Sequence, residues 1–337
     1  MSFFIIIQMY ILIQTFIGVY TSNNTYNKID DLNNIRIMQF NVEWLYIDYF
    51  EPADCPGNGC PWANISEANI HMEHIISVIN ELKPNLVNFC EIEGINEMNI
   101  IKNNITNNYN TYLIKGTDTS TGQNVGLMTN ISPTRNLYRT DMKTNYPIEN
   151  SNCNSSINGT TGVSKHYITE LNINNLNIAM IGAHLLSMPT DPDRCSKREA
   201  QSIILQSIIY DYIIKKYEIL LIGDFNDFDN DIYDINNNKP ISKVIDILKG
   251  NSGTYAGKYS LNTVAINISQ QERYTNWWDS DNNCNTSSIN DYSMIDHILV
   301  SNILYSHITN AFIFHSYNEY CGKYNSDHYP IIIDLII

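Results

Sequence analysis

Short clusters of acidic, amide and histidine residues each end or interrupt an apolar segment of this chain. In order, they are Phe40-Asn41-Val42-Glu43, Phe89-Cys90-Glu91, Gly182-Ala183-His184, Gly223-Asp224-Phe225-Asn226, Ile295-Asp296 and Ser326-Asp327-His328. A carboxylate in a buried segment is costly unless it is paired or bound to a cation. Carboxylate and amide oxygens that converge at the ends of packed strands would hold a hard divalent cation. The pattern therefore predicts a metal centre with histidine beside it.

Glu91 is the first candidate metal ligand, because it ends an apolar segment that should be buried. Alone it would be interpreted as a carboxylate at a surface strand edge, but the neighbouring clusters favour metal ligation. Asn41 and Glu43 are two residues apart and therefore share one face of a predicted strand. We interpret Asn41 as an amide that orients the metal ligands or their water. The alternative is an amide that ties a strand end to a loop.

Asp224 and Asn226 follow the apolar segment 220–222 and Gly223, and this glycine lets the backbone turn sharply and approach a ligand. The alternative is a simple turn, but the acidic residues at 227, 229 and 231 exceed what a turn needs. Their alternation resembles a calcium-binding loop, yet the glycine and the distal glutamate of that motif are missing. A catalytic role is therefore favoured for this segment.

Two histidines stand at strand ends beside carboxylates: His184 ends an apolar segment and His328 follows Asp327. A lone histidine is usually structural, but this repeated placement indicates catalysis. Asp296 interrupts another apolar segment and needs a partner, for which His328 is the natural candidate. Lys165 would offer a positive charge to a phosphate, the alternative being a solvated lysine at a strand edge.

Composition restricts the class of partner. The chain has 337 residues, of which 43% are hydrophobic, so it can bury a large core. The formal net charge is -15, and no run of lysine and arginine reaches four residues. Such acidity disfavours an extended nucleic-acid footprint. It still permits a metal-centred phosphate site, because a bound divalent ion reverses the local charge.

The composition of the first residues is typical of a targeting segment. An apolar stretch over 3–20 predicts a signal peptide over 1–21, followed by a polar linker over 22–34. The stretch starts without basic residues, and its length leaves an uncleaved membrane anchor as the alternative. Seven cysteines, together with glycosylation sequons such as those at Asn154 and Asn158, agree with export. We therefore expect a secreted protein or one of the secretory pathway.

The cysteines predict disulfides rather than a zinc site, because their spacing does not match zinc motifs. Cys55 and Cys60 flank a turn and would close a small loop, whereas Cys90 lies in an apolar strand and reads as the buried odd thiol. Other cysteines lie in polar segments, and their pairing stays open: Cys153, Cys195, Cys284 and Cys321.

The hydrophobic periodicity predicts one α/β domain over 35–337. Helices are expected over 66–83, with Ser66 as the cap, over 196–217 and over 240–249, and 145–162 reads as a loop. The strands are expected over 35–42, 86–90, 124–129, 165–173, 178–184, 219–223, 294–300 and 329–336. Strands and helices do not alternate regularly, which argues against a plain parallel wound sheet.

Local roles are expected for three more residues. Arg198 is adjacent to Glu199 near the start of a predicted helix and is interpreted as forming a local ion pair with it. Of the neighbouring Trp277 and Trp278, one is expected in the core and the other would stack on substrate or contact a membrane. No feature indicates a stable protein partner, so a monomer is expected.

Taken in this order, the motifs resemble the endonuclease/exonuclease/phosphatase superfamily, the deoxyribonuclease I-like proteins. The resemblance spans about 35–337, and its most specific segments are Gly-Asp-Phe-Asn at 223–226 and Ser-Asp-His-Tyr-Pro at 326–330. It implies a four-layer α/β sandwich of two mostly antiparallel sheets packed face to face, with helices outside. The implied activity is hydrolysis of a phosphoester by in-line attack of water, with Mg²⁺ or Mn²⁺ as cofactor.

The resemblance also implies roles for individual residues. Glu91 would bind the metal, with Asn41 and Asp327 close to it. The remaining assignments are catalytic or substrate-binding: Asp224 positions or deprotonates the water, Asn226 holds the water or the phosphate, His184 and Lys165 contact phosphate oxygens, and His328 paired with Asp296 is the second acid/base or stabiliser.

Departures from the family pattern restrict the branch. Cys90 stands where the family usually has glutamine, and Gln123 stands where pancreatic-type deoxyribonucleases pair a glutamate with the histidine matching His184. The AP-endonuclease branch has tyrosine at the position of His184, so abasic-site repair is disfavoured. We expect a secreted metal-dependent phosphodiesterase, foremost a nuclease. The alternatives are a sphingomyelinase-like or inositol-phosphate hydrolase and, from another class, an inactive binding module.

Overall fold

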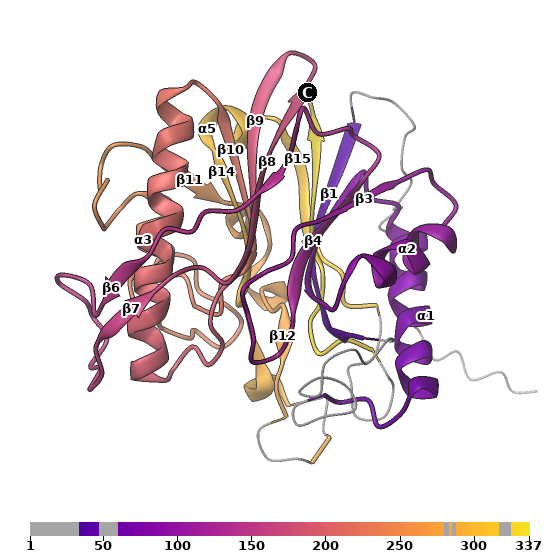
Figure 1. Ribbon diagram of the computed structural model, residues 1–337, viewed down its shortest axis with the longest axis horizontal. Helices are drawn as coiled ribbons and strands as arrows, with labels where there is room; N and C mark the ends of the chain where they lie inside the picture. Colours follow the sequence, from indigo (N-terminus) through magenta and orange to yellow (C-terminus); the bar gives the residue numbers. More distant parts are fainter. Residues whose placement is uncertain (1–33, 47–59, 280–282, 285–287, 317–324) are drawn as a thin grey trace, which may run out of the picture.

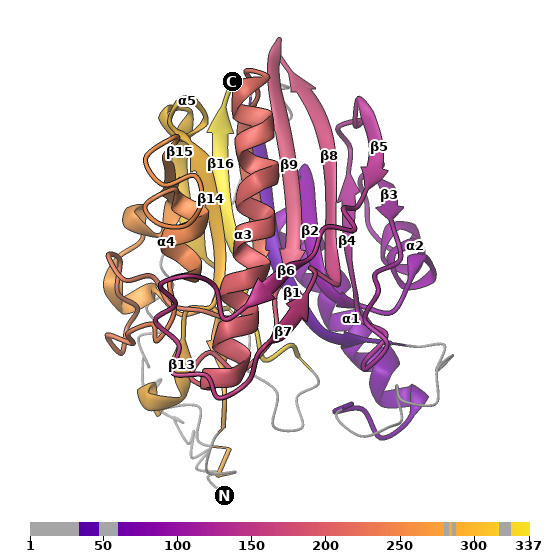
Figure 2. The same ribbon diagram turned by 60° about the vertical axis from the view of Figure 1, so that its left-hand side comes forward.

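Two six-stranded sheets pack face to face, with helices on both outer surfaces (Figure 1). The computed structural model describes residues 34–46, 60–279, 283–284, 288–316 and 325–337. The predicted leader over 1–21 lies outside these residues, as does the predicted linker over 22–34 except for Asn34, which begins the first strand. The helices α1 and α2 cover one sheet and α3 covers the other, as the turned view in Figure 2 also shows. The predicted four-layer α/β sandwich is confirmed.

The first sheet has the strand order β15-β16-β1-β2-β4-β3 and the second has the order β11-β14-β10-β9-β8-β5. In the first sheet the strands are β15 (Ile308–Ile313), β16 (Ile331–Ile336), β1 (Asn34–Leu45), β2 (Leu86–Ile92), β4 (Asn124–Thr129) and β3 (Asn110–Leu113). In the second they are β11 (Leu261–Thr263), β14 (Asp296–Ser301), β10 (Glu218–Asp224), β9 (Leu176–His184), β8 (Lys165–Ile173) and β5 (Arg135–Tyr138).

Smaller elements surround the sheets. The helices are α1 (Ile65–Leu82), α2 (Ile95–Asn103), α3 (Pro192–Ile214), α4 (Val244–Lys249) and α5 (Asn302–Ser306). Single 3₁₀ turns form at η1 (Val264–Asn267), η2 (Gln270–Glu272) and η3 (Ile289–Asp291). Two short hairpins pair β12 (Asn276–Trp277) with β13 (Tyr292–Ser293) and β6 (Thr144–Tyr146) with β7 (Gly159–Thr161).

Each sheet is antiparallel except for one parallel pair, which is β1 with β2 in the first sheet and β9 with β10 in the second. Alternate residues of β8, β9, β10 and β14 enter the core between the sheets, and the others pack against the outer helices. Ligand sites in α/β sheets commonly lie at the carboxyl ends of parallel strands. The two parallel pairs therefore mark one edge of the sandwich as the place to search.

Several boundaries differ from the expectation for local reasons. Asn64, not Ser66, caps α1, because its side chain accepts from the backbone N–H groups of Ser66 and Glu67. The helix α3 begins at Pro192, four residues earlier than expected, with Asp191 as its cap. The expected loop over 145–162 contains the β6–β7 hairpin. The sequence reading also missed α2, β3, β5 and β15, which are short or lie at sheet edges.

The cysteines are mostly paired. Cys153 and Cys195 form a disulfide that joins the segment after β6 to α3. Cys60 and Cys284 each belong to a separate disulfide. Cys90 is free and buried, as expected for the odd thiol. The predicted Cys55–Cys60 loop involves Cys55, which lies outside the described residues. Within the part of the chain that the structure describes, none of the helices combines the length and apolarity needed to cross a membrane.

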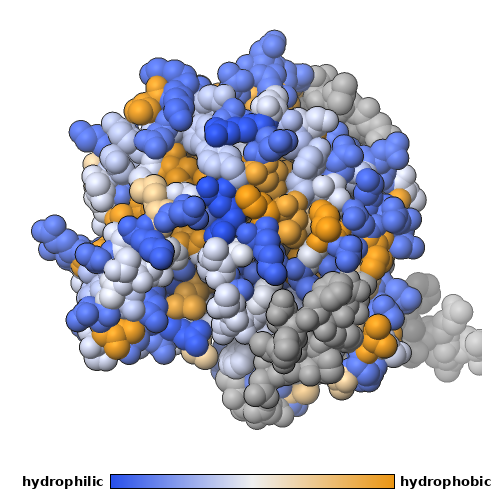
Figure 3. All heavy atoms as spheres, in the orientation of Figure 1, coloured by the Kyte–Doolittle hydropathy of each residue, from blue (hydrophilic) through white to orange (hydrophobic). Residues whose placement is uncertain are grey.

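The surface agrees with a chain rich in amides and hydroxyls. Hydrophilic side chains predominate on the face in Figure 3, with hydrophobic ones gathered in smaller groups near its centre. Of the two adjacent tryptophans, Trp277 is in the core, whereas Trp278 is 67% exposed. One tryptophan is thus structural, as expected, and the other is available at the surface.

Candidate active site

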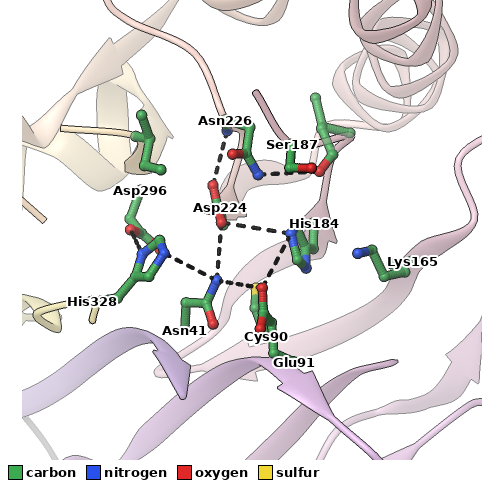
Figure 4. Close-up of polar contacts among 12 residues, drawn as sticks. Asn41, Cys90, Glu91, Lys165, His184, Ser187, Asp224, Asn226, Asp296 and His328 are labelled. Carbon is green, nitrogen blue, oxygen red and sulfur yellow. Dashed lines mark hydrogen bonds and ion pairs between the residues drawn. The ribbon is translucent and has the colours of Figure 1, made fainter. Parts of the chain in front are cut away.

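Four of the predicted site residues form one row across the second sheet. In the strand register Lys165 lies opposite His184, His184 beside Asp224, and Asp224 opposite Asp296. Each lies in phase with the residues of its strand that enter the core between the sheets. The row therefore faces the first sheet at the carboxyl ends of β9 and β10, where the sequence analysis placed it (Figure 4).

The first sheet supplies Asn41 and Glu91 to the same place. Cys90 enters the core between the sheets, so regular alternation would turn Glu91 outward. Instead a bulge interrupts the β2–β4 register at this point and Glu91 has φ 66°. This turn brings Glu91 Oε1 to 3.3 Å from Asn41 Nδ2 and 3.9 Å from His184 Nε2. A strained backbone conformation at a site residue is typical of functional positions.

Asn41 links the carboxylates of both sheets. Its Nδ2 donates to Asp224 Oδ2 at 3.0 Å as well as facing Glu91, and its Oδ1 accepts from the backbone N–H of Glu43 at 3.1 Å. Glu43 and Trp44 have φ values of 40° and 48°, so the strand alternation that placed Asn41 and Glu43 on one face ends here. Asn41 thus contacts the acidic groups of both sheets and is placed for the orienting role that the sequence predicts.

Asp224 lies at the centre of the cluster and begins a tight turn. Its Oδ1 accepts from the backbone N–H of Asn226 at 2.9 Å, and Asn226 Nδ2 donates to the carbonyl of Leu185 at 3.2 Å. Glycine is required at position 223, where β10 packs closely against β9, because a Cβ atom there would lie 1.8 Å from the carbonyl oxygen of Ala183. Asn226 has φ 51°, a conformation that asparagine tolerates better than most residues. The Gly-Asp-Phe-Asn segment is thus a closely packed turn.

His328 and Asp296 form the predicted pair. His328 Nδ1 lies 2.7 Å from Asp296 Oδ2, and the other ring nitrogen lies 3.5 Å from Asn41 Nδ2 and 3.9 Å from Asp327 Oδ1. Ligand atoms of Asp224, Asp296 and His328 all lie within 4.8 Å of one another. Burial opposes a charge on the imidazole, but Asp296 and Asp327 outweigh it and hold the pKa of His328 well above its ordinary value.

The buried carboxyl groups of the site repel one another. Burial and the neighbouring Asp296 raise the pKa of Asp224 to about 8. Burial and nearby Glu91 raise the pKa of Asp327 to about 6, against the opposing effect of His328. Burial and Asp327 raise the pKa of Glu43 well above its ordinary value. Buried carboxylates that repel in this way would be stabilised by a bound cation.

The donor set fits a hard divalent cation. Carboxylate and amide oxygens are the groups that Mg²⁺ and Mn²⁺ prefer, and Glu91, Asn41 and Asp327 remain the residues that would hold the ion. The close group of Asp224, Asp296 and His328 is less suited as a ligand set, because Asp296 and His328 already bind each other. Glu43 belongs to the same acidic group, since its carboxylate accepts from the backbone N–H of Asp327 at 2.9 Å.

His184 is buried and differs from the second histidine in its charge state. Burial and the nearby Lys165 hold the pKa of His184 well below its ordinary value, so its imidazole is neutral at physiological pH. Its Nε2 lies 3.6 Å from Asp224 Oδ2, and its Nδ1 is buried without a hydrogen-bond partner. Gln123 instead accepts from Lys165 Nζ at 3.0 Å. His184 therefore does not form the pair with residue 123 that a glutamate makes in pancreatic-type deoxyribonucleases, as the sequence predicted. Gln123 holds Lys165 in place instead.

The acidic segment after Asp224 is neutralised by basic residues rather than open to a cation. Asp227 pairs with Arg198, both fully buried, with Arg198 Nε 3.2 Å from Asp227 Oδ2. Asp229 pairs with Lys249 at 2.8 Å, and Lys249 also reaches Asp231. The interpretation of Arg198 as a local partner of Glu199 is wrong. Its guanidinium also donates to the carbonyls of 186–189, so it ties the segment after His184 to the segment after Asp224.

The structure thus brings all the predicted site residues to one edge of the sandwich. Sequence reasoning missed Gln39, Gln123 as a partner of Lys165, and Thr275, whose hydroxyl accepts from the backbone N–H of Asp296 at 3.0 Å. Gln39 had a readable signal, because it lies two residues before Asn41 and so shares its strand face.

Comparisons with solved structures identify the fold. No protein-family model matches the chain, and a search of curated proteins found no match. Among solved structures, a truncated TDP2 from Caenorhabditis elegans matches over 90% of this chain and 98% of its own, with TM-score 0.52 and 13% identity. This chain has the deoxyribonuclease I-like fold. An endonuclease/exonuclease/phosphatase family protein from Bacteroides thetaiotaomicron matches in the same way, with TM-score 0.52 and 13% identity over 90% and 94% of the two chains.

Two further neighbours share this fold and differ in their stated activities. A mannosyl-6-phosphatase from Bacteroides thetaiotaomicron has TM-score 0.54 and 12% identity, and an AP endonuclease from Archaeoglobus fulgidus has TM-score 0.54 and 13% identity. Each match covers 90% of this chain and 100% of the neighbour. The deoxyribonuclease I-like architecture therefore supports several phosphoester substrates, and the substrate of this chain has to be argued from its site.

Mg²⁺ is expected to stabilise the protein more at about pH 8.5 than at about pH 5.5. The pKa values of Asp224 and Asp327 are raised to about 8 and about 6 in the folded chain. The stability contributed by their protonated forms is therefore present at low pH and is lost as the pH rises through those values. A cation offsets this loss, because it binds the deprotonated carboxylates. At about 100 times Kd it should raise Tm by about 5 °C or more at the higher pH.

Thermal unfolding with and without Mg²⁺ measures the effect at both pH values. Glu91→Gln should remove most of the shift. Asp334→Asn, at the far end of the first sheet, should retain it. An equal shift at both pH values, or a full shift in Glu91→Gln, would contradict the assignment of the metal site.

Proposed function

We propose that this chain is a secreted, monomeric, divalent-metal-dependent phosphoester hydrolase that cleaves a phosphodiester by in-line attack of water, foremost in nucleic acid. The observation that carries the proposal is the row Lys165, His184, Asp224 and Asp296 facing Glu91 and Asn41 across the two sheets. Export is supported by the apolar first residues and by the Cys153–Cys195 disulfide.

Asp224 is placed to accept the proton of the attacking water. Its pKa of about 8 lies near the operating pH of a general base. Asn226 would hold the water or the phosphate from the adjacent turn. His328, kept cationic by Asp296, would stabilise negative charge or protonate the leaving oxygen. A bound Mg²⁺ or Mn²⁺ would add stabilisation of the negative charge on the phosphoryl group.

Nothing in this arrangement calls for a covalent intermediate. The buried Cys90 thiol is a poor nucleophile, because burial raises its pKa far above the ordinary value. An inactive binding module would be expected to lack at least one of the residues that do this chemistry. All of them are present, and they converge on a single site.

A lipid head group is the second candidate substrate, and one observation favours it. Trp278 is 67% exposed, and the backbone of the preceding Trp277 donates to the carbonyl of Asp327 at 2.8 Å. A large aromatic residue thus lies next to the site, where a membrane or a nucleobase would pack against it. The formal charge of -15 also disfavours extended contact with a phosphate backbone.

Parallel assays decide between these substrates. The purified protein is given Mg²⁺ and either supercoiled plasmid or vesicles of sphingomyelin, and Trp278→Ala is tested beside it. Nicking of plasmid with no head-group release supports the nuclease. Head-group release that falls in Trp278→Ala, with the plasmid intact, would reassign the protein to lipid hydrolysis.

Lys165→Met is expected to lower kcat/KM by about 10- to 100-fold, the loss typical of a hydrogen bond to a charged group. Gln123 and the more distant Asp118, 3.7 Å away, hold the Lys165 ammonium at the end of the catalytic row, where it would contact a phosphate oxygen. Steady-state kinetics measure the effect. Lys165→Arg should retain much of the activity, because the charge remains. A full rate in Lys165→Met would reduce this lysine to a structural partner of Gln123.

A further inference from the structure

A chain of buried hydrogen bonds runs from the core to the catalytic pair. The hydroxyl of Tyr167 donates to Asn88 Oδ1 at 2.7 Å, and Asn88 Nδ2 donates to Gln39 Oε1 at 2.5 Å. Gln39 Nε2 then donates to Asp296 Oδ1 at 3.0 Å. All four side chains are completely buried. The chain crosses from the second sheet to the first and back again, so it depends on both sheets.

The direction of each bond is determined by the one before it. The phenol of Tyr167 is the donor to an amide oxygen, so Asn88 must present its nitrogen to Gln39. The oxygen of Gln39 is therefore occupied, and its nitrogen faces Asp296. Gly182 makes this possible, because a Cβ atom there would lie 2.3 Å from Asn88 Oδ1. The local packing is thus built around this set of amides.

Asp296 has two carboxylate oxygens and a separate partner on each. Oδ2 binds His328 Nδ1 at 2.7 Å, and Oδ1 accepts from Gln39. A carboxylate held at both oxygens cannot rotate, so the plane in which the imidazole hydrogen bond forms is fixed. Gln39 Nε2 also lies 3.5 Å from Cys90 Sγ, so an amide at position 90 could reach the same space.

We infer that Gln39 is a positioning residue for catalysis, which acts by holding Asp296 so that His328 faces the reacting phosphorus group. The inference rests on the proposed function in assuming that His328 takes part in the reaction. Gln39 itself touches neither substrate nor metal. It works through Asp296, and its removal should affect the rate of the chemical step rather than the binding of substrate.

Gln39→Met tests the inference, because methionine has nearly the same shape without the amide. We expect kcat to fall on the order of 10- to 100-fold, with KM changed less than about threefold. Asn88→Ser is the matched control, since it breaks two bonds of the same chain but leaves the contact between Gln39 and Asp296. It should lower Tm comparably and kcat far less. In Gln39→Ser the added change Cys90→Gln should restore part of kcat.

A second measurement does not need activity. The downfield NMR resonance of the proton between His328 and Asp296 should shift or broaden in Gln39→Met and remain in Asn88→Ser. An unchanged resonance in Gln39→Met would overturn the inference, as would losses of kcat that simply follow Tm in both variants. A shifted resonance in a protein without hydrolase activity would support the positioning role and contradict the proposed function instead.

Discussion

Asp224→Asn is expected to lower kcat by about three orders of magnitude or more and to leave the fold intact. Asparagine keeps the shape of the side chain, but its single amide oxygen can accept only one of the two hydrogen bonds that the carboxylate accepts, which come from Asn41 Nδ2 at 3.0 Å and from the backbone N–H of Asn226 at 2.9 Å. It cannot accept the proton of the attacking water. The loss should therefore appear in kcat, with little change in KM.

Asp224→Asn is also expected to change the stability of the protein, in a direction that distinguishes it from a variant that is inactive because it is misfolded. Burial raises the pKa of Asp224 to about 8, so the stability that its protonated form contributes is lost as the pH rises through that value. Asparagine removes this penalty. Without metal, Asp224→Asn should therefore have a higher Tm than the wild type at about pH 9.

Steady-state kinetics and thermal unfolding measure both effects. Asp334→Asn is the matched control, because Asp334 pairs with Arg36 at 2.7 Å at the far end of the first sheet. It should lose stability and keep its rate. A rate in Asp224→Asn within about tenfold of the wild type would remove Asp224 from the mechanism.

His328→Gln is expected to lower kcat by about 10²- to 10⁴-fold with a smaller loss of stability than His328→Ala. Asp296 is completely buried, so removing its imidazole partner leaves a buried carboxylate half unpaired. Glutamine can donate to that carboxylate, although it cannot carry the charge or transfer a proton. The comparison of the two variants separates the catalytic role of His328 from its structural one.

The pH dependence gives an independent check on this residue. The pKa of His328 is held well above its ordinary value by Asp296 and Asp327, against the effect of burial. The stability and charge that depend on the imidazolium should therefore persist above the usual range of histidine and be lost as the pH rises further. His307→Ala, remote from the site, should not affect the rate. A full rate in His328→Gln would contradict the assignment.

The fold class was predicted from hydrophobic periodicity and from the family resemblance, whereas most residues of the candidate site were predicted from one physical signal. Residues such as Asp224, Asp296 and His184 lie at the ends of strands that are otherwise apolar, where burying a polar or charged side chain costs free energy. Such positions can therefore be recognised in the sequence as candidates for a functional site. Gly223 was predicted to let the backbone turn and approach a ligand, and the structure shows that it allows close packing against Ala183, where a Cβ atom would lie 1.8 Å from the carbonyl oxygen.

Other features of the candidate site could not be predicted, because they depend on backbone irregularities and on contacts between residues far apart in the sequence. Glu91 reaches the site through a positive φ at a bulge, whereas regular alternation would turn it away. Arg198 pairs with Asp227, 29 positions along the chain, rather than with its neighbour Glu199. Gln39 had the correct strand face but no partner that the sequence could name, because Asp296 is 257 positions away.

The most direct test of the central claim is hydrolysis by the purified chain with Mg²⁺, with EDTA, and with Mg²⁺ restored. Plasmid DNA, RNA, sphingomyelin and inositol phosphates serve as substrates, and Asp224→Asn/His328→Ala is the control. We predict that at least one phosphoester is cleaved, that EDTA stops the cleavage, that added Mg²⁺ restores it, and that the double variant lacks it. Cleavage that survives EDTA or the double variant, or no cleavage of any of these substrates, would contradict a metal-dependent phosphoester hydrolase.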